Sequence, residues 1–230
     1  MSQSKTYNYT ADFHIHSIYS PPSFIKGYAS RSSIQDILNI AKSRGLRAIA
    51  ITDHNNITGS LLAHQMAKKM GIIAVPAVEV SSKSGHILAF NVTSQIKMGM
   101  TIRETVDKIH DEGGLAICAH PMLPIVGVGK KHIPKFDGVE RINGRAPKQL
   151  PQKLIPENLF YTGGSDAHTL KEIGNTLTTF REPINEIEDI LNQLKSRKNS
   201  TFKATKRRTF YEVIVPSLKN FSRYIIDHMY

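Results

Sequence analysis

The sequence predicts an α/β fold built from parallel β/α units, and three observations support this. Apolar runs of strand length alternate with amphipathic stretches of helical periodicity through the first half of the chain. Neither an internal repeat nor a low-complexity tract interrupts this alternation. The chain has 230 residues, of which 40% are hydrophobic, and this is enough for one large domain with a buried core.

In the first half, each expected strand is a short apolar run, and each expected helix repeats apolar residues every three or four positions. Gly45 ends the first helix and Gly71 ends the second, because glycine is a common stop signal after a helix. The predicted order is strand 11–16, helix 33–44, strand 46–52, helix 60–70 and strand 72–80.

The middle of the chain adds a hairpin and a third helix. Residues 86–92 follow the turn-like run SSKSG and are expected to pair with the preceding strand. Thr101 and Glu104 have the spacing of a capping box, which predicts a helix that begins there and closes at Gly113. An apolar run at 115–119 predicts the next strand.

The second half is less regular. Pro, Gly and Lys are frequent between residues 121 and 158, which predicts mostly loop with one strand at 138–142. Short strands are expected at 160–162 and 176–180. A helix then follows, because apolar residues recur at helical spacing in Ile184, Ile187, Ile190, Leu191 and Leu194.

Composition narrows the possible functions. The single cysteine, Cys118, can form no internal disulfide, and the first residues lack the plan of a signal peptide, so we expect a cytoplasmic protein. No stretch approaches the roughly 20 apolar residues that cross a bilayer, which argues against a membrane protein. Lys and Arg number 30 against 19 Asp and Glu, and the net charge of +11 favours an anionic partner such as a phosphate ester or a nucleic acid.

We expect one domain over residues 1–194 and a basic tail over residues 195–230. Nine Lys and Arg against two acidic residues give the tail +7 of the net charge. Apolar residues at helical spacing predict a final helix that packs on the domain: Phe210, Ile214, Leu218 and Phe221. The basic residues of the tail have two readings, a solvated face or contact with a nucleic-acid backbone beside stacking aromatic residues.

Polar residues with metal-ligand chemistry follow the expected strands. In a β/α barrel, the carboxyl ends of the strands form the face where active sites are assembled. His14 and His16 are two residues apart in a strand, so their rings share one face. Imidazole and carboxylate suit zinc, manganese or iron. The candidate ligands are His14, His16, His54, Glu79, His86, His120, Asp166 and His168.

Several neighbouring residues are given other roles. Asp12 and Asp53 lie one or two residues from the histidines and are expected to orient imidazoles rather than bind metal. Cys118 is expected to pack in the core. The other histidines lack the placement at strand ends and are predicted to be surface residues: His64, His110, His132 and His228.

Five motifs occur in one order between residues 12 and 174: DFHIHS, ITDHN, PAVEVSS with GHILAF, AHP and GGSDAHTLKEIG. They resemble the motifs of the polymerase and histidinol phosphatase (PHP) superfamily. The resemblance implies a distorted seven-stranded β/α barrel that holds two or three metal ions and acts on phosphate esters. It implies a first ion on His14, His16, Glu79 and Asp166, a second on Glu79, His86 and His120, and a third on His54 and His168.

The chain departs from the family's pattern at two places. Members usually carry an acid five residues after the second histidine of the first motif, where this chain has Pro21. The third ion then has only two obvious protein ligands, so we expect it to bind weakly, to arrive with substrate or to be absent. Many members also place a helix between NGR and GGSDAH, which the chain's prolines argue against: Pro147, Pro151 and Pro156.

These residues together predict a metal-dependent phosphoesterase. A metal lowers the pKa of water toward about 7, and we expect the resulting hydroxide to attack phosphorus near Glu79, with Asp166 and His168 as further catalytic candidates. Arg145 in NGR is a candidate phosphate clamp through its planar guanidinium. The substrate is either a small phosphomonoester or nucleotide, or DNA or RNA held by the tail. The non-enzyme alternative is a metal-stabilised anion-binding module, favoured by Pro21.

Overall fold

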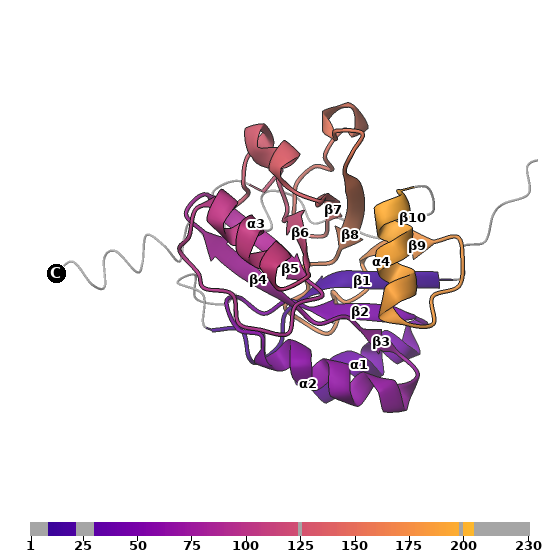
Figure 1. Cartoon of the computed structure of the whole chain (residues 1–230). Coiled ribbons are helices and arrows are strands. Elements are labelled where there is room, and N and C mark those ends of the chain that lie inside the picture. The colour runs from indigo at the N-terminus through magenta and orange to yellow at the C-terminus, as the bar shows by residue number, and fades with distance from the viewer. Residues whose placement is uncertain (1–8, 22–29, 124–125, 198–199, 205–230) are drawn as a thin grey trace, which may run out of the picture.

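The computed structural model describes residues 9–21, 30–123, 126–197 and 200–204. These residues form a mixed α/β fold, with two five-stranded sheets at its centre and helices packed against them (Figure 1). The helices are α1 (Ile34–Ser43), α2 (Thr58–Ala67), α3 (Ile102–Asp111) and α4 (Ile187–Ser196), with short 3-10 turns η1 (Lys68–Met70), η2 (Lys130–Lys135) and η3 (Gln152–Leu154).

The first sheet has the order β10-β9-β1-β2-β3. β1 and β3 run parallel to β2, whereas β9 runs antiparallel to both of its neighbours. The strands are β1 (Tyr9–Ile15), β2 (Ala48–Ile51), β3 (Ile73–Ala74), β9 (Thr176–Phe180) and β10 (Ser200–Ala204). α1 and α2 lie side by side along the β1–β3 part of this sheet (Figure 1).

The second sheet has the order β4-β5-β6-β7-β8. β5 pairs antiparallel with β4 and β6, and β6, β7 and β8 are parallel. The strands are β4 (Ala77–Ser82), β5 (Gly85–Phe90), β6 (Leu115–Cys118), β7 (Gly138–Asn143) and β8 (Phe160–Gly164). α3 packs against β4, β5 and β6, and α4 packs against β8.

The two sheets approach each other at two places, and an isolated β-bridge joins them at each place. Ile15 at the end of β1 bridges Ala167 after β8, and His54 after β2 bridges Glu79 in β4. Between the sheets, the ring of Phe13 packs against Phe90 and Phe180, with centroids 5.0 and 6.1 Å away. These contacts bury an apolar core between the sheets and leave the ends of β1, β2, β4 and β8 close together.

The structure confirms the α/β class, but no closed seven-stranded barrel is found over the described residues. One expected strand, 72–80, divides into β3 and β4, which belong to different sheets. The division falls at Val75 and Pro76, and proline lacks the N–H that a central strand needs. The two-residue link between β4 and β5 permits only antiparallel pairing, so the hairpin expected at 86–92 is confirmed.

The helix signals in the sequence correspond to real caps. The side chain of Ser33 accepts a hydrogen bond from the backbone N–H of Asp36 at the start of α1. Thr101 and Glu104 form the predicted capping box of α3, and Gly113 follows that helix with a φ of 75°. The region between residues 121 and 158 is mostly loop with a strand at β7, as predicted.

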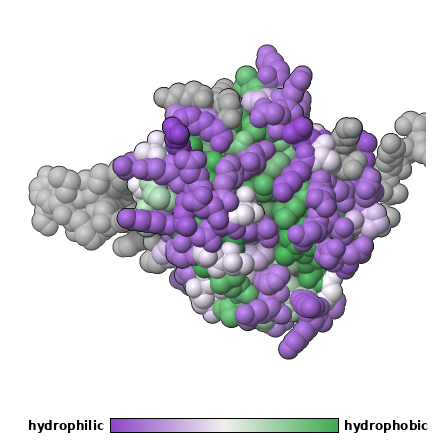
Figure 2. Space-filling view, viewed as in Figure 1, coloured by the Kyte–Doolittle hydropathy of each residue, from purple (hydrophilic) through white to green (hydrophobic). Residues whose placement is uncertain are grey.

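The predicted boundary at residue 194 falls inside α4, and β10 beyond it pairs with β9. The predicted final helix and the basic residues of 205–230 lie outside the described residues. Figure 2 shows a face covered largely by hydrophilic side chains, with hydrophobic ones in patches between them. Within the described ranges, every helix is too short or too polar to cross a membrane.

Candidate metal centre

The eight candidate ligands meet at one end of the two sheets. β5 runs antiparallel to its neighbours, so its first residues reach the same end as the last residues of the parallel strands. The ligands are His14 and His16 at the end of β1, His54 after β2, Glu79 in β4, His86 at the start of β5, His120 after β6, and Asp166 and His168 after β8. Residues separated by up to 154 positions therefore converge because of the strand topology.

The carboxylate of Glu79 lies at the centre of the cluster and is fully buried. Its Oε1 atom lies 2.8 Å from His120 Nε2 and 3.0 Å from His86 Nδ1. Its Oε2 atom faces three further nitrogens: His54 Nδ1 at 3.0 Å, His16 Nε2 at 3.3 Å and His14 Nε2 at 3.4 Å. One carboxylate thus faces five imidazole rings.

Asp166 provides a second buried carboxylate on the other side of the cluster. Its Oδ1 atom lies 3.4 Å from His16 Nε2, 3.6 Å from His168 Nδ1 and 3.7 Å from His14 Nε2. Four groups of three side chains have ligand atoms within 4.8 Å of one another: His14–His16–Asp166, His14–Glu79–His120, His54–Glu79–His86 and His16–His54–His168. The last group gives His54 and His168 a third imidazole, from His16.

The donor atoms of this cluster fit divalent cations. Four buried atoms that face one another have no hydrogen-bond partner: His14 Nε2, His16 Nε2, His54 Nδ1 and Glu79 Oε2. A buried polar atom without a partner costs about 1–3 kcal/mol, so several such atoms around one space need a common partner. Nitrogen and carboxylate oxygen donors in this arrangement are the ligands that zinc and related metals prefer.

Electrostatics keep both carboxylates ionised. Burial alone would raise the pKa of Glu79, but the imidazoles of His54 and His86 hold this pKa well below its usual range. Burial opposes ionisation of Asp166 too, and His14 with His16 and other neighbours lower its pKa well below the usual range. Both carboxylates are therefore available as anionic ligands for a cation.

The histidines divide into two electrostatic classes. Burial would lower the pKa of His14, yet Glu140, Asp166 and Glu79 raise it well above the usual value. For His54, burial dominates and lowers the pKa to about 3, so this imidazole is neutral at physiological pH and free to bind a cation. Burial likewise lowers the pKa of His168.

Glu140 is a buried carboxylate that sequence reasoning missed. Its Oε1 atom lies 3.1 Å from His14 Nδ1, and its Oε2 atom accepts hydrogen bonds from the backbone N–H of His120 at 2.8 Å and from Asn143 Nδ2 at 2.9 Å. It thereby turns the Nε2 atom of His14 toward Glu79 and Asp166. The available signal was an acid at the middle of the predicted strand 138–142.

Asp12 and Asp53 were expected to orient imidazoles, and the structure corrects this. Asp12 accepts hydrogen bonds from the backbone N–H groups of His14, Ser165 and Gly174, at 3.4, 2.9 and 2.7 Å. Asp53 accepts the backbone N–H and the hydroxyl of Ser17. Both carboxylates fasten the backbone around the cluster. Burial raises the pKa of Asp12 to about 6.

Arg145 is buried beside the cluster, with 6% of its surface exposed. Its Nε atom donates to the backbone oxygen of Asp166 at 2.7 Å, and its Nη2 atom donates to Glu172 Oε2 at 3.3 Å. The guanidinium that the sequence suggested as a phosphate clamp is thus engaged with the loop that carries Asp166.

Of the residues given other roles, Cys118, His64 and His110 lie where the sequence predicts, and His132 is more buried than the predicted surface position. Cys118 is buried in the core, and burial raises the pKa of its thiol. His64 and His110 are exposed, and His110 Nε2 lies 2.8 Å from Asp137 Oδ2. His132 is half-buried and is in none of the four ligand groups. His228 lies outside the described residues.

The sequence also matches profiles of known families. A profile of the PHP domain matches residues 12–135, which is more than half of the chain. The chain belongs to the PHP domain family. A second profile, for a PHP-associated region, matches residues 158–199. The family predicted from the five motifs is thereby confirmed.

Two curated relatives illustrate the breadth of this PHP family. An uncharacterised protein of Methanocaldococcus jannaschii is 33% identical, and the match covers 63% of this chain and 95% of that protein. An error-prone DNA polymerase of Symbiobacterium thermophilum is 35% identical over 80 residues, which is 35% of this chain and 7% of the polymerase.

Solved structures share the fold of this PHP-domain chain. A two-domain protein of Bacteroides vulgatus that contains a predicted PHP-like metal-dependent phosphoesterase has a TM-score of 0.68 at 18% identity, covering 92% of this chain and 69% of that one. The lesion-specific endonuclease Q of Pyrococcus furiosus has a TM-score of 0.63 at 17% identity, covering 84% and 57%. Endonuclease Q in complex with a 27-mer duplex has a TM-score of 0.63 at 14% identity, covering 90% and 66%.

Proposed function

We propose that this PHP-domain protein is a metal-dependent phosphatase that acts on a small phosphomonoester or a nucleotide. The family and the ligand cluster make the chain a metal-dependent hydrolase of phosphoester bonds. The observation that carries the proposal is the Glu79 carboxylate, whose Oε2 atom faces three imidazole nitrogens without hydrogen bonding to any of them. A shared cation would give all of these facing atoms a favourable partner at once, whereas a proton on one imidazole satisfies only one contact.

We assign the ligands as follows. His14, His16, Glu79 and Asp166 would hold one ion, and Glu79, His86 and His120 a second. His54 and His168, with His16 nearby, would hold a third. Zinc, manganese and iron all suit this donor set. Bound divalent ions supply Lewis acidity, which neutralises the phosphate charge and makes a water nucleophile available near neutral pH.

The protein's own residues prepare the centre for an anionic ester. Glu79 and Asp166 stay ionised, and the neutral imidazole of His54 can bind without first losing a proton. The buried carboxylate of Glu140 fixes the ring of His14. This prior ordering means that little side-chain motion is needed when the ester arrives.

The exposure of the ligands favours a small substrate. His54 and His86 have side chains that are 20% and 18% exposed, whereas the other six ligands are at most 6% exposed. A phosphate group therefore approaches from the side of His54, which follows the end of β2, and His86, which lies at the start of β5. A terminal phosphate of a small molecule reaches such a recessed centre more readily than a phosphate within a stiff duplex.

The test compares substrates on the purified full chain with Mn²⁺ or Zn²⁺ added. We expect turnover of p-nitrophenyl phosphate or nucleoside monophosphates, and loss of at least 100-fold in kcat for Glu79→Gln, because this change removes the shared charge at the centre. The exposed residue Gln65 supplies a control, since Gln65→Ala should keep full activity. Wild-type protein that binds metal but hydrolyses no ester would support the anion-binding module instead.

A nuclease is the second candidate, and two observations favour it. The fold matches endonuclease Q in complex with a DNA duplex, and residues 195–230 carry a net charge of +7. We propose that the basic tail would hold the polynucleotide. Deletion of residues 205–230 should then abolish cleavage of a labelled oligonucleotide and leave turnover of p-nitrophenyl phosphate intact. Equal effects on both substrates, or on neither, would remove the nuclease reading.

A further inference from the structure

The loop that carries Asp166 and His168 adopts a backbone conformation that needs support. Asp166 has a φ of 53°, in the left-handed region that side chains other than glycine seldom occupy. Such a conformation persists when surrounding contacts determine it, and these are often found at functional sites.

Arg145 holds the loop from the side of β7. The residue lies two positions after the end of this strand, and its backbone N–H donates to Asn143 Oδ1 at 2.8 Å. Its Nε atom donates to the backbone oxygen of Asp166 at 2.7 Å. The same guanidinium reaches Glu172, with Nη2 lying 3.3 and 3.4 Å from the two carboxylate oxygens.

Glu172 holds the same loop from its far end. Its Oε2 atom accepts the backbone N–H groups of His168 at 2.9 Å and Thr169 at 3.0 Å. Only 7% of the surface of Glu172 is exposed, and 6% of the surface of Arg145. A buried guanidinium and a buried carboxylate therefore fasten the loop at both Asp166 and His168.

We propose that Arg145 and Glu172 are positioning residues that hold Asp166 and His168 in the geometry of metal binding. The inference rests on the proposed metal centre, and it gives Arg145 a task different from clamping substrate phosphate. Residues that orient metal ligands in this way change metal affinity or activity by about 10–100-fold when they are mutated. Neither residue needs to touch the ester for this effect.

The first experiment titrates metal-free full-length protein with Co²⁺ and follows the visible absorption of the bound ion. Glu172→Gln should keep the shape of the side chain but replace one oxygen, which now accepts hydrogen bonds, with an NH₂ group. The loop should then be held less firmly. We expect affinity for at least one Co²⁺ to fall about 10–100-fold, with a changed absorption band. Unchanged affinity and an unchanged spectrum would overturn the proposal.

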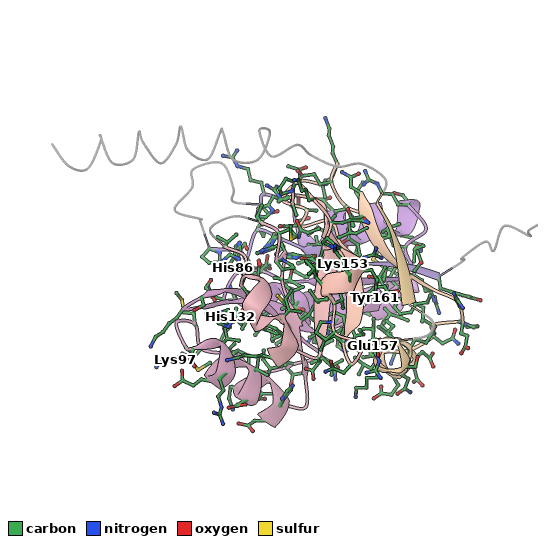
Figure 3. The ribbon with its side chains drawn as sticks, turned by 90° about the horizontal axis from the view of Figure 1, so that it is seen from above. His86, Lys97, His132, Lys153, Glu157 and Tyr161 are labelled. Atoms are coloured by element: carbon green, nitrogen blue, oxygen red, sulfur yellow. The ribbon has the colours of Figure 1, made fainter. Side chains whose placement is uncertain are left out.

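Two variants separate positioning from a general loss of stability. Thr101→Ala removes the cap of α3, which carries none of the candidate ligands, and should lower the melting temperature while leaving the Co²⁺ spectrum intact. Glu157→Gln removes an exposed carboxylate well away from His86 (Figure 3) and should change neither property. If Thr101→Ala altered the Co²⁺ spectrum as Glu172→Gln does, the effect would be structural only, and the proposal would fail.

The Arg145 variants separate positioning from clamping. A positioning role predicts that Arg145→Met weakens Co²⁺ binding and lowers kcat, with KM changed less than kcat, and that Arg145→Lys recovers part of the metal affinity. A clamp predicts a raised KM for p-nitrophenyl phosphate with Co²⁺ binding unchanged, which would overturn the proposal. Since Co²⁺ binding is measured without substrate, wild-type protein that hydrolyses no ester would refute the proposed function and leave this inference standing.

Discussion

Gly164 shows how closely the residues around the metal centre are packed. A Cβ atom at this position would lie 2.5 Å from the Cβ atom of His14 and 2.6 Å from Glu140 Oε1. Real Cβ atoms do not approach other atoms so closely. The residue must therefore be glycine for β8 to run past the first strand while Glu140 keeps its contact with His14.

We predict that Gly164→Ala lowers the unfolding free energy by about 1–3 kcal/mol, because overpacking forces the backbone or neighbouring side chains to shift. Displacing Glu140 should also weaken metal binding, since Glu140 orients the ring of His14. Denaturant unfolding and Co²⁺ titration measure the two effects. Gln65→Ala, on the exposed face of α2, is the matched control, and equal behaviour of the two variants would contradict the prediction.

At this scale, the sequence predicted which candidate ligands meet in the cluster more fully than it predicted the residues that support them. His14, His54 and Asp166 stand out because polar residues that end apolar strands have few structural reasons to be there. The supports act through partners that sequence position does not reveal. Glu140 meets His14 across 126 residues, and Glu172 meets Arg145 across 27 residues, so neither contact has a local pattern.

At the scale of elements, helix caps are the features whose energy can be isolated. In α3, the Thr101 hydroxyl accepts the backbone N–H of Glu104, and the Glu104 carboxylate accepts the backbone N–H of Thr101. The hydrogen bonds to Thr101 lower the pKa of Glu104. These contacts satisfy N–H groups that have no partner within the helix.

We predict that Thr101→Ala lowers the unfolding free energy by about 1 kcal/mol, the usual effect of removing a threonine cap. Arg103→Ala on the same helix is the control, because the side chain of Arg103 is 85% exposed and its pair with Asp107 is weak. Chemical denaturation of both variants checks the difference. If Thr101→Ala and Arg103→Ala had the same free energy of unfolding, the cap would contribute nothing to the stability of α3.

The elements also show where sequence reasoning stops. Caps and apolar periodicity are local, so α1 and α3 were predicted within one or two residues of their bounds. Strand partners are not local. Pro76 explains the break between β3 and β4, but nothing in this segment shows that the two halves join different sheets. The expected closed barrel was therefore not confirmed over the described residues.

At the scale of the whole molecule, metal and fold are thermodynamically linked. The candidate ligands come from both sheets, and over the described residues the bridge between His54 and Glu79 is one of two that join the sheets. A ligand that binds only the folded chain stabilises it by RT ln(1 + [L]/Kd), which is about 4 kcal/mol at 1,000 times Kd. Removing the metal should therefore lower the melting temperature of the entire domain.

The sign of the pH dependence follows from the shifted pKa values of the metal-free chain. Burial would lower the pKa of His14, but the neighbouring carboxylates raise it. The protonated form of His14 therefore stabilises the fold at pH values below an ordinary histidine pKa. That contribution is lost as pH rises through the raised value. The lowered pKa of Glu79 contributes stability above its ordinary pKa, which is lost as pH falls through the lowered value. These two contributions are both present between the ordinary pKa values of glutamate and histidine, whereas the lowered pKa values of His54 and His168 favour the metal-free fold above the ordinary histidine pKa.

Higher pH favours metal binding to His14, because a cation binds imidazole only in its neutral form. We predict that the gap in melting temperature between metal-loaded protein and protein treated with a chelator widens as pH rises from about 6 to about 9, since protons compete for His14 at the lower end. Thermal scans at several pH values, with Mn²⁺ or with a chelator, measure this gap. A gap that stays constant or narrows over this range would mean that the cluster does not exchange protons for metal, and the assignment of its histidines as ligands would be wrong.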